Sequence, residues 1–157
     1  MAVLHSASLL YRDRAWLFSG HSGIGKSTHT KLWNDLLQTP LLNGDLNLLA
    51  IENGQPVIHG LPWCGTSKIS DVHTYALGGI ILLKQAETDF AEALSESQKQ
   101  LLIMQRFISP SWTEEQQTAN LRFAKELAPH ILICRLHCTP SPSAVTAIKQ
   151  TIDTYLK

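Results

Sequence analysis

The sequence predicts a single α/β domain, spanning residues 1–157, around a mixed β-sheet. A glycine-rich phosphate-binding motif stands between a strand-like apolar run and a stretch of helical periodicity. Strand-like and helix-like segments then follow one another along the chain, which is typical of α/β proteins. The dipeptide Asn53-Gly54 separates two strand-like segments, and this dipeptide favours an antiparallel hairpin. Together these observations indicate a sheet that contains both parallel and antiparallel strands.

The first third of the chain leads into and out of the motif. We expect strands over residues 3–11 and 15–19, joined by a tight turn over residues 12–14. A helix is expected over residues 28–37, because apolar side chains recur there at helical spacing. The members of this apolar stripe are Leu32, Trp33, Leu36 and Leu37.

The middle of the chain is rich in predicted strands. A short strand over residues 41–45 precedes a hairpin with strands over residues 46–52 and 55–59. Residues 60–71 show little periodicity and are expected to form a loop. Residues 76–84 are expected to form a buried strand.

The last third alternates between helices and a strand. The expected elements are helices over residues 90–108, 114–127 and 144–156 and a strand over residues 130–136. Two residues are candidate N-caps of the helix that begins at residue 114, namely Ser111 and Thr113.

The motif, Gly-His-Ser-Gly-Ile-Gly-Lys-Ser from Gly20 to Ser27, matches the pattern G-x-x-x-x-G-K-[ST]. Its glycines allow successive backbone N–H groups to turn inward, and the following helix adds its positive N-terminal end. Lys26 would contact the β- and γ-phosphates of a nucleoside triphosphate, and the Ser27 hydroxyl can bind Mg²⁺. A glycine-rich turn that contains a lysine by chance is the alternative. The residues expected to hold the nucleotide are Gly20, His21, Ser22, Gly23, Ile24, Gly25, Lys26, Ser27 and Thr28.

A phosphate-binding loop needs a second group for the metal, normally an aspartate at the end of a neighbouring strand. Asp45 is the best candidate, because it stands at the end of the short strand over residues 41–45. Ser27 and Asp45 are therefore the expected metal ligands. The alternative is that Asn43-Gly44-Asp45 only caps a turn, and Asp71 is then the weaker candidate for the metal.

Composition narrows the class of protein. A chain of 157 residues suffices for one domain with a proper core, and 44% apolar against 17% charged residues suits a globular protein. A net charge of zero gives no reason to expect nucleic-acid binding. The longest apolar run, residues 75–83, is too short to cross a membrane, and the N-terminus does not resemble a secretion signal. An odd count of three cysteines favours a cytoplasmic location.

The motifs together resemble the catalytic domain of HPr kinase/phosphorylase and, more closely, the small HPr-kinase-like and phosphoenolpyruvate-carboxykinase-like ATP-binding proteins. The matching segments are the strand with His5, the loop from Gly20 to Thr28, Leu32-Trp33, Leu42-Asn43-Gly44-Asp45, Gly60-Leu61-Pro62-Trp63-Cys64-Gly65 and residues 79–85. The resemblance implies a P-loop kinase fold of the HPr kinase C-terminal-domain type. It also implies ATP and Mg²⁺ as cofactors and a serine hydroxyl of a peptide or protein as phosphoryl acceptor.

The resemblance transfers some catalytic positions and not others. Lys26 and Ser27 match the nucleotide and metal positions, and His5 lies where HPr kinases place a histidine. HPr kinases have two adjacent acids after the first helix, whereas this chain has Gly44-Asp45. The family's downstream signature, rich in Glu and Arg, is absent as well, so HPr itself is not the expected acceptor. The expected catalytic residues are Asp45, Lys26 and His5, with His5 either serving as the base or simply packed on its strand.

The loop over residues 60–68 is the expected acceptor side of the site. Trp63 offers a flat apolar surface, Cys64 and Gly65 lie beside it, and Lys68 could meet a phosphate. In the alternative, this is a surface loop whose tryptophan fills the core.

Three functions remain open from the sequence. The leading one is a serine kinase of HPr-kinase-like type that acts on a peptide or protein. A small-molecule kinase is a second possibility, although few arginines follow the hairpin to form a lid. A third is an ATP-binding regulatory module with little catalysis, which the missing second acid favours. The sequence does not decide between a monomer and a homo-oligomer.

Overall fold

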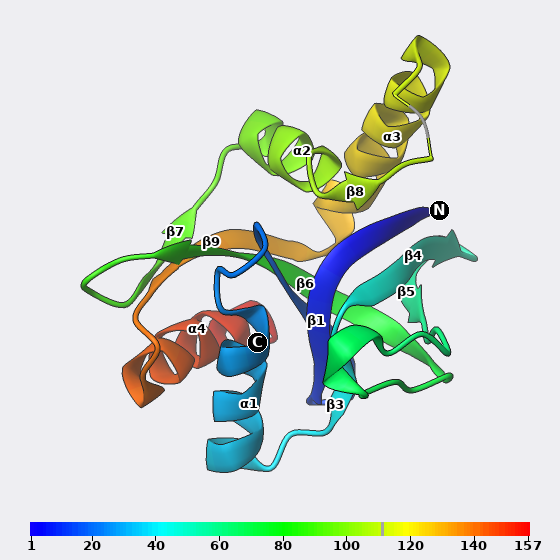
Figure 1. Ribbon diagram of the computed structural model, residues 1–157. Coiled ribbons are helices and arrows are strands. Elements are labelled where there is room, and N and C mark those ends of the chain that lie inside the picture. Colours follow the sequence, from blue (N-terminus) through cyan, green and yellow to red (C-terminus); the bar gives the residue numbers. More distant parts are fainter. Residues whose placement is uncertain (111) are drawn as a thin grey trace.

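The computed structural model describes residues 1–110 and 112–157 (Figure 1). Its strands are β1 (Ala2–Tyr11), β2 (Arg14–Ser19), β3 (Leu41–Asn43), β4 (Leu46–Glu52), β5 (Gln55–His59), β6 (Thr74–Gln85), β7 (Phe90–Ala93), β8 (Phe107–Ile108) and β9 (Leu132–Cys138). Its α-helices are α1 (Lys26–Leu37), α2 (Glu96–Met104), α3 (Glu114–Leu127) and α4 (Pro142–Tyr155), and single 3₁₀ turns cover Gly65–Ser67 and Ala128–His130. The result is an α/β domain with a mixed sheet, as predicted.

Two long strands, β1 and β6, each take part in two parts of the sheet. The first half of β1 pairs with β4 and β8, and its second half pairs with β2 and β3. Strand β6 begins antiparallel to β5 and continues parallel to both β2 and β9. The second halves therefore form a layer in the order β3-β1-β2-β6-β9-β7, with the parallel strands at its centre. The carboxyl ends of β2, β6 and β9 consequently meet at one edge.

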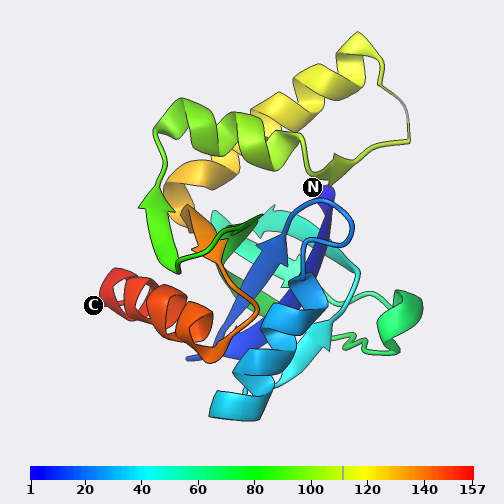
Figure 2. The ribbon, with the colours of Figure 1, turned by 60° about the vertical axis from the view of Figure 1, so that its left-hand side comes forward.

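Helices cover both faces of this layer (Figures 1 and 2). Helices α1 and α4 pack on one face, where Trp16 and Phe18 of β2 belong to the same buried cluster as Trp33 of α1. Helices α2 and α3 pack on the other face, where Leu17 joins a second cluster with Ile103 of α2. The alternation of side chains along β2 thus divides the core into two layers. Within the described residues, no helix combines the length and the apolar character needed to cross a lipid bilayer.

Both predicted hairpins are confirmed. Arg12 and Asp13 have φ angles of 50° and 58°, and Asn53 and Gly54 have φ angles of 51° and 76°. Two consecutive residues with positive φ are the mark of a primed turn, whose twist matches that of the strands it joins.

The prediction of one helix over residues 90–108 is wrong. Phe90–Ala93 forms an edge strand antiparallel to β9, and Phe107–Ile108 pairs with β1. Only Glu96–Met104 is helical, because Ser95 and Gln98 form a capping box that starts the helix there. Thr113 caps α3 as predicted, accepting a hydrogen bond from the N–H of Gln116 at 3.2 Å. The other candidate cap, Ser111, lies outside the described residues.

The apolar stripe predicted for the first helix is only partly correct. Trp33 is fully buried, but Leu36 and Leu37 are 49% and 38% exposed. The last turns of α1 continue past the ends of the strands, so they have no core to cover (Figure 1). The buried face of α1 instead includes polar residues near the loop, among them His29 and Thr30.

Candidate functional site

The loop between β2 and α1 depends on two glycines and leaves the first N–H groups of α1 exposed to a ligand. Gly23 and Gly25 have φ angles of 79° and 108°, which residues with a Cβ atom rarely adopt. Ile24 is 6% exposed and anchors the loop, and its N–H donates to the carbonyl of His21 at 3.2 Å. Gly25 occupies the N-cap position of α1 and supplies no side-chain cap, so the first N–H groups of the helix remain available for a ligand. This arrangement is suited to binding an anion.

Lys26 lies against the inside of this loop. Its Nζ atom is 3.4 Å from the carbonyl oxygen of Gly20 and 3.3 Å from that of His21. The side chain is buried, and this burial lowers the pKa of Lys26, while the nearby charge of Asp45 raises it and that of Arg106 lowers it further. The ammonium is thus held among polar groups of the site without a direct carboxylate partner among the described residues.

Ser27 and Thr28 follow Lys26 in the first turn of α1. Both side chains are exposed, and Ser27 lines a cleft between α1, β3 and the 3₁₀ turn over Gly65–Ser67. A hydroxyl in this position is free to bind a ligand at the helix N-terminus.

The strand predicted over residues 41–45 ends at Asn43, because the Asn43 side chain bonds the following backbone into a turn. Asp45 therefore lies in the turn between β3 and β4, where Asn43 fixes its position. The side-chain oxygen of Asn43 accepts hydrogen bonds from the N–H of Asp45 at 2.9 Å and of Leu46 at 3.1 Å. The amide nitrogen of Asn43 donates to the carbonyl oxygen of Trp63 at 3.0 Å. Asn43 is only 2% exposed, so one buried amide orders both the acid and the predicted acceptor loop.

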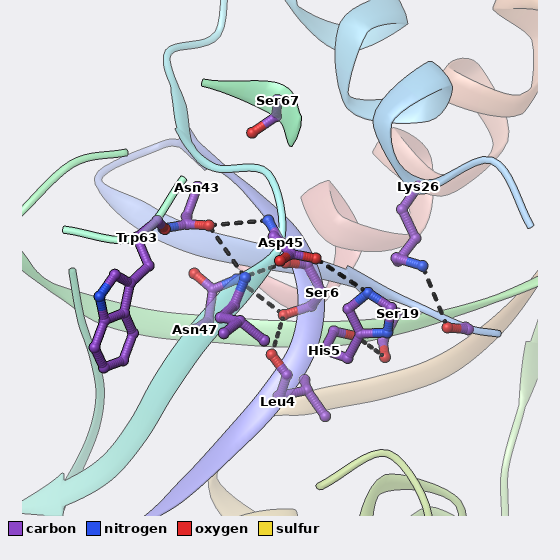
Figure 3. A network of polar contacts seen from close by, with 12 residues as sticks. Leu4, His5, Ser6, Ser19, Lys26, Asn43, Asp45, Asn47, Trp63 and Ser67 are labelled. Atoms are coloured by element: carbon purple, nitrogen blue, oxygen red, sulfur yellow. Dashed lines mark hydrogen bonds and ion pairs between the residues drawn. The ribbon is translucent and has the colours of Figure 1, made fainter. Parts of the chain in front are cut away.

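His5 meets Asp45 from the neighbouring strand β1. Its Nε2 atom is 3.2 Å from Oδ1 of Asp45 (Figure 3). The backbone supports this pair, because the N–H of Ser6 donates to the carbonyl of Asp45 at 3.0 Å. The Ser19 hydroxyl, at the end of β2, donates to the carbonyl of His5 at 2.7 Å. The nearby charge of Asp45 also acts on Lys26, so the predicted catalytic residues His5, Asp45 and Lys26 lie in one region (Figure 3).

The place of a second acid beside Asp45 is filled by Ser67. A Cβ atom on Gly44 would collide with the hydroxyl and Cβ of Ser67. That hydroxyl donates to the carbonyl of Cys64 at 2.7 Å and accepts from the N–H of Ile69 at 3.2 Å. Gly44 therefore provides the room in which the loop docks, a relationship that the sequence does not reveal.

The four predicted acceptor-side residues have different environments. Gly65 lies against the acid, since a Cβ atom on it would stand 2.7 Å from Oδ2 of Asp45. Trp63 is 65% exposed, so it does not fill the core, and Lys68 is exposed as well. Cys64 is half-buried. Gly65 alone of the four is shown in contact with Asp45.

A cleft of about 310 Å³, which we call the first cleft, opens on one side of the loop. Gly25, Thr28 and His29 line it from the loop and α1, and Ala86 and residues 138–140 line it from the ends of β6 and β9. Trp33 Nε1 donates to Nε2 of His29 at 3.2 Å. Because an indole nitrogen is only a donor, the His29 proton resides on Nδ1. Burial lowers the pKa of His29 to about 4, so the ring is neutral at physiological pH.

A second cleft, of about 430 Å³, opens on the other side of the loop, and we call it the basic cleft. Gly20 and His21 line it from the loop, Lys84 and Arg135 from β6 and β9, and Arg106 from the end of α2. The carbonyl of Arg106 accepts a hydrogen bond from the N–H of His5 at 3.4 Å. Sequence reasoning missed these basic residues as a group, because they come from three distant segments and carry no motif.

Oxygen donors suited to Mg²⁺ are present at the loop. Ser27 offers a hydroxyl and Asp45 a carboxylate, and a nucleotide-bound Mg²⁺ needs only one or two protein ligands beside the phosphates. Residues 1–110 and 112–157 contain no group of three or more histidine, cysteine or acidic side chains that could hold a metal alone. The weaker candidate Asp71 is already engaged, since it accepts hydrogen bonds from the N–H of His73 at 2.7 Å and the Tyr75 hydroxyl at 3.0 Å.

Comparison with known proteins shows the fold. No protein-family model matches the chain, and no curated protein matches it. Among solved structures, the chain is similar to the HPr(Ser) kinase/phosphatase from Coxiella burnetii, with a TM-score of 0.54 and 15% sequence identity. The similarity covers 98% of this chain and 99% of the other. The chain thus has an HPr-kinase-like fold.

Proposed function

We propose that this protein is a P-loop kinase of HPr-kinase-like type, which binds Mg·ATP and transfers the γ-phosphoryl group to a serine hydroxyl of a peptide or protein. One observation carries the proposal above the others. An open glycine loop with a buried lysine stands beside a histidine–aspartate pair, with 3.2 Å between His5 Nε2 and Asp45 Oδ1. The HPr-kinase-like fold supports the same function, because the structural neighbour is a kinase/phosphatase.

The nucleotide would bind with its phosphates at the loop and its adenine base in the first cleft. The N–H groups around Gly25 and the Lys26 ammonium can bind the phosphates, and the first cleft offers space for the adenine base. The neutral His29 ring turns a donor, Nδ1–H, to the side away from Trp33. Ser27 and Asp45 would hold Mg²⁺, which when bound neutralises the charge that develops on the phosphates.

The transfer itself needs a positioned hydroxyl and an acceptor for its proton. The serine oxygen forms a bond to the γ-phosphorus, the bond between that phosphorus and the bridging oxygen breaks, and ADP leaves with the electron pair. His5 takes the hydroxyl proton, while Asp45 orients the imidazole. The loop over residues 60–68, with Trp63 exposed at its surface, would contact the acceptor.

Incubation with γ-labelled ATP, Mg²⁺ and serine-containing peptides tests this function. Label on a serine of a peptide, lost in Lys26→Ala, is the expected result. If calorimetry detects no Mg·ATP binding to the wild type or to Lys26→Ala, the proposal is refuted.

One observation favours a second function, an ATP-binding regulatory module with little catalysis. The docking of Ser67 on Gly44 leaves no room for a second acid beside Asp45. Tight Mg·ATP binding without transfer or hydrolysis would identify this function instead.

A further inference from the structure

The basic cleft carries an excess of positive charge beside the phosphate-binding loop. Three cationic side chains line it, those of Lys84, Arg106 and Arg135. Glu92 contacts Arg135, with 3.1 Å between Oε2 and Nη1, but it also contacts Nε2 of His137 at 2.7 Å. Within the described part of the chain, no carboxylate lies within 4.0 Å of the cationic nitrogens of Lys84 or Arg106. The cleft is therefore electrostatically suited to an anion.

Arg106 and Arg135 are both attached to well-ordered backbone, Arg135 within β9 and Arg106 directly after α2. Arg135 is on β9, and Glu92 of the adjacent strand β7 contacts its guanidinium. Arg106 follows α2, where its N–H donates to the carbonyl of Ile103 at 2.9 Å and its carbonyl accepts from His5. Backbone bonds on both sides of Arg106 fix the root of its side chain beside the histidine–aspartate pair. Guanidinium groups on such supports can bind carboxylate or phosphate through two donors at once.

The basic cleft lies on the side of the loop on which the Lys26 ammonium rests. Ile24 lines both clefts, so the loop separates them. Gly20 and His21, on whose carbonyls the Lys26 ammonium rests, line only the basic cleft. Since the lysine of such a loop contacts the β- and γ-phosphates, the end of the nucleotide that is transferred faces the basic cleft. The nearby charge of Arg106 also lowers the pKa of Lys26, which agrees with their closeness.

We propose that the basic cleft binds an anionic group of the phosphoryl acceptor, a carboxylate or a phosphate close to the reacting hydroxyl, through Arg106 and Arg135. This inference rests on the proposed kinase function and specifies its substrate class. Acidic peptides and phosphorylated small molecules share this chemistry, and they are separated by the second experiment below.

Calorimetric titration with sodium sulfate tests the cleft on the whole chain saturated with Mg·AMP-PNP. Because the nucleotide analogue occupies the loop, sulfate must bind elsewhere. We expect binding to the wild type and a loss of affinity of about tenfold or more in Arg106→Gln and in Arg135→Gln. Arg106→Lys should recover part of the affinity. Arg122→Gln, an exposed arginine on α3 outside this cleft, is the matched control and should bind sulfate like the wild type.

Two results would overturn the inference: no sulfate binding to the loaded wild type, or equal binding to the wild type, Arg106→Gln and Arg135→Gln. If Mg·AMP-PNP itself does not bind, the proposed function fails, and sulfate is titrated into the unloaded protein. Binding that survives Lys26→Ala and is lost in Arg135→Gln still assigns an anion site to the cleft. Binding that is lost in Lys26→Ala and survives in Arg135→Gln places the anion in the phosphate-binding loop, and it refutes the anion site in the basic cleft.

A transfer assay identifies the source of the anion. Serine peptides with Asp or Asn beside the serine, and phosphorylated or unphosphorylated small alcohols, are compared as acceptors. Within either the peptide pair or the alcohol pair, we expect the anionic acceptor to be phosphorylated faster than the neutral one. The ratio of the two rates should be smaller in Arg135→Gln than in the wild type. Equal use of anionic and neutral acceptors would contradict the proposal.

Discussion

The imidazole of His5 lies 3.2 Å from the carboxylate of Asp45, although 40 positions separate them in the chain. Strand β1 brings them together, because its first half pairs with β4 in a register that sets His5 opposite Leu46, the residue after Asp45. The same aspartate has Gly65 against its other oxygen. A single carboxylate thus joins the strand that carries the candidate base to the loop that would meet the acceptor.

Lys26→Ala is expected to weaken Mg·ATP binding by roughly 10- to 150-fold, since hydrogen bonds to charged groups contribute about 1.5–3 kcal/mol. Isothermal titration calorimetry measures the change. Lys31→Ala is the matched control, because Lys31 is on the same helix but is exposed and paired with Asp35. Equal affinity in Lys26→Ala and Lys31→Ala would show that the loop does not bind the triphosphate.

His5→Gln is expected to lower the rate of transfer by roughly 10²–10⁴-fold, the usual contribution of a general base, with little effect on nucleotide affinity. A steady-state assay with γ-labelled ATP, run beside calorimetry, separates the two quantities. His73→Gln serves as control, because His73 is an exposed histidine that also pairs with an aspartate, with 2.7 Å between its Nδ1 and Oδ1 of Asp71. A normal rate in His5→Gln would assign the proton transfer elsewhere.

Gly44→Asp is expected to destabilise the fold by about 1–3 kcal/mol, because the new side chain collides with Ser67 and displaces the loop. In the Ser67→Gly variant the space beside Gly44 is empty, so adding Gly44→Asp should lower the free energy of unfolding by less than it does in the wild type. Urea unfolding of the two single variants and the double variant measures the coupling between the positions. Additive effects would mean that Ser67 does not occupy the space beside Gly44.

The features that the sequence reveals are those encoded by neighbouring residues. The phosphate-binding loop lies within Gly20 to Ser27, and each primed turn depends on two adjacent residues, such as Asn53 and Gly54. The strand at Phe90–Ala93 was missed because four residues carry too little pattern, and it exists through pairing with β9. Local capping chemistry, the pair Ser95 and Gln98, could have divided that segment correctly.

The features that the sequence does not reveal are contacts between distant segments. Ser67 fills the room left by Gly44, and Asn43 holds the same loop through the carbonyl of Trp63. Arg106 reaches the site because a short strand after α2 pairs with β1. Neither relationship leaves a periodicity or a spacing in the chain, since each depends on tertiary packing.

The buried His29 is expected to make stability depend on pH. Its pKa is lowered by burial from 6.5 to about 4, so below pH 6.5 the unfolded chain binds a proton that the folded protein does not. The free energy of unfolding should therefore fall as the pH drops from about 6.5 towards 4, by up to about 3 kcal/mol from this residue. Above pH 6.5 the ring is neutral in both states and contributes no slope. Urea unfolding at several pH values measures the effect.

His29→Gln isolates this contribution from those of the other six histidines. Glutamine cannot titrate, yet its side-chain oxygen can still accept the hydrogen bond from Trp33 Nε1. The variant should therefore lose part of the fall in stability between pH 6.5 and pH 4 while it retains the fold. A fall as steep in His29→Gln as in the wild type would mean that the ring becomes protonated inside the folded protein, and the neutral donor assigned to the first cleft would then be incorrect.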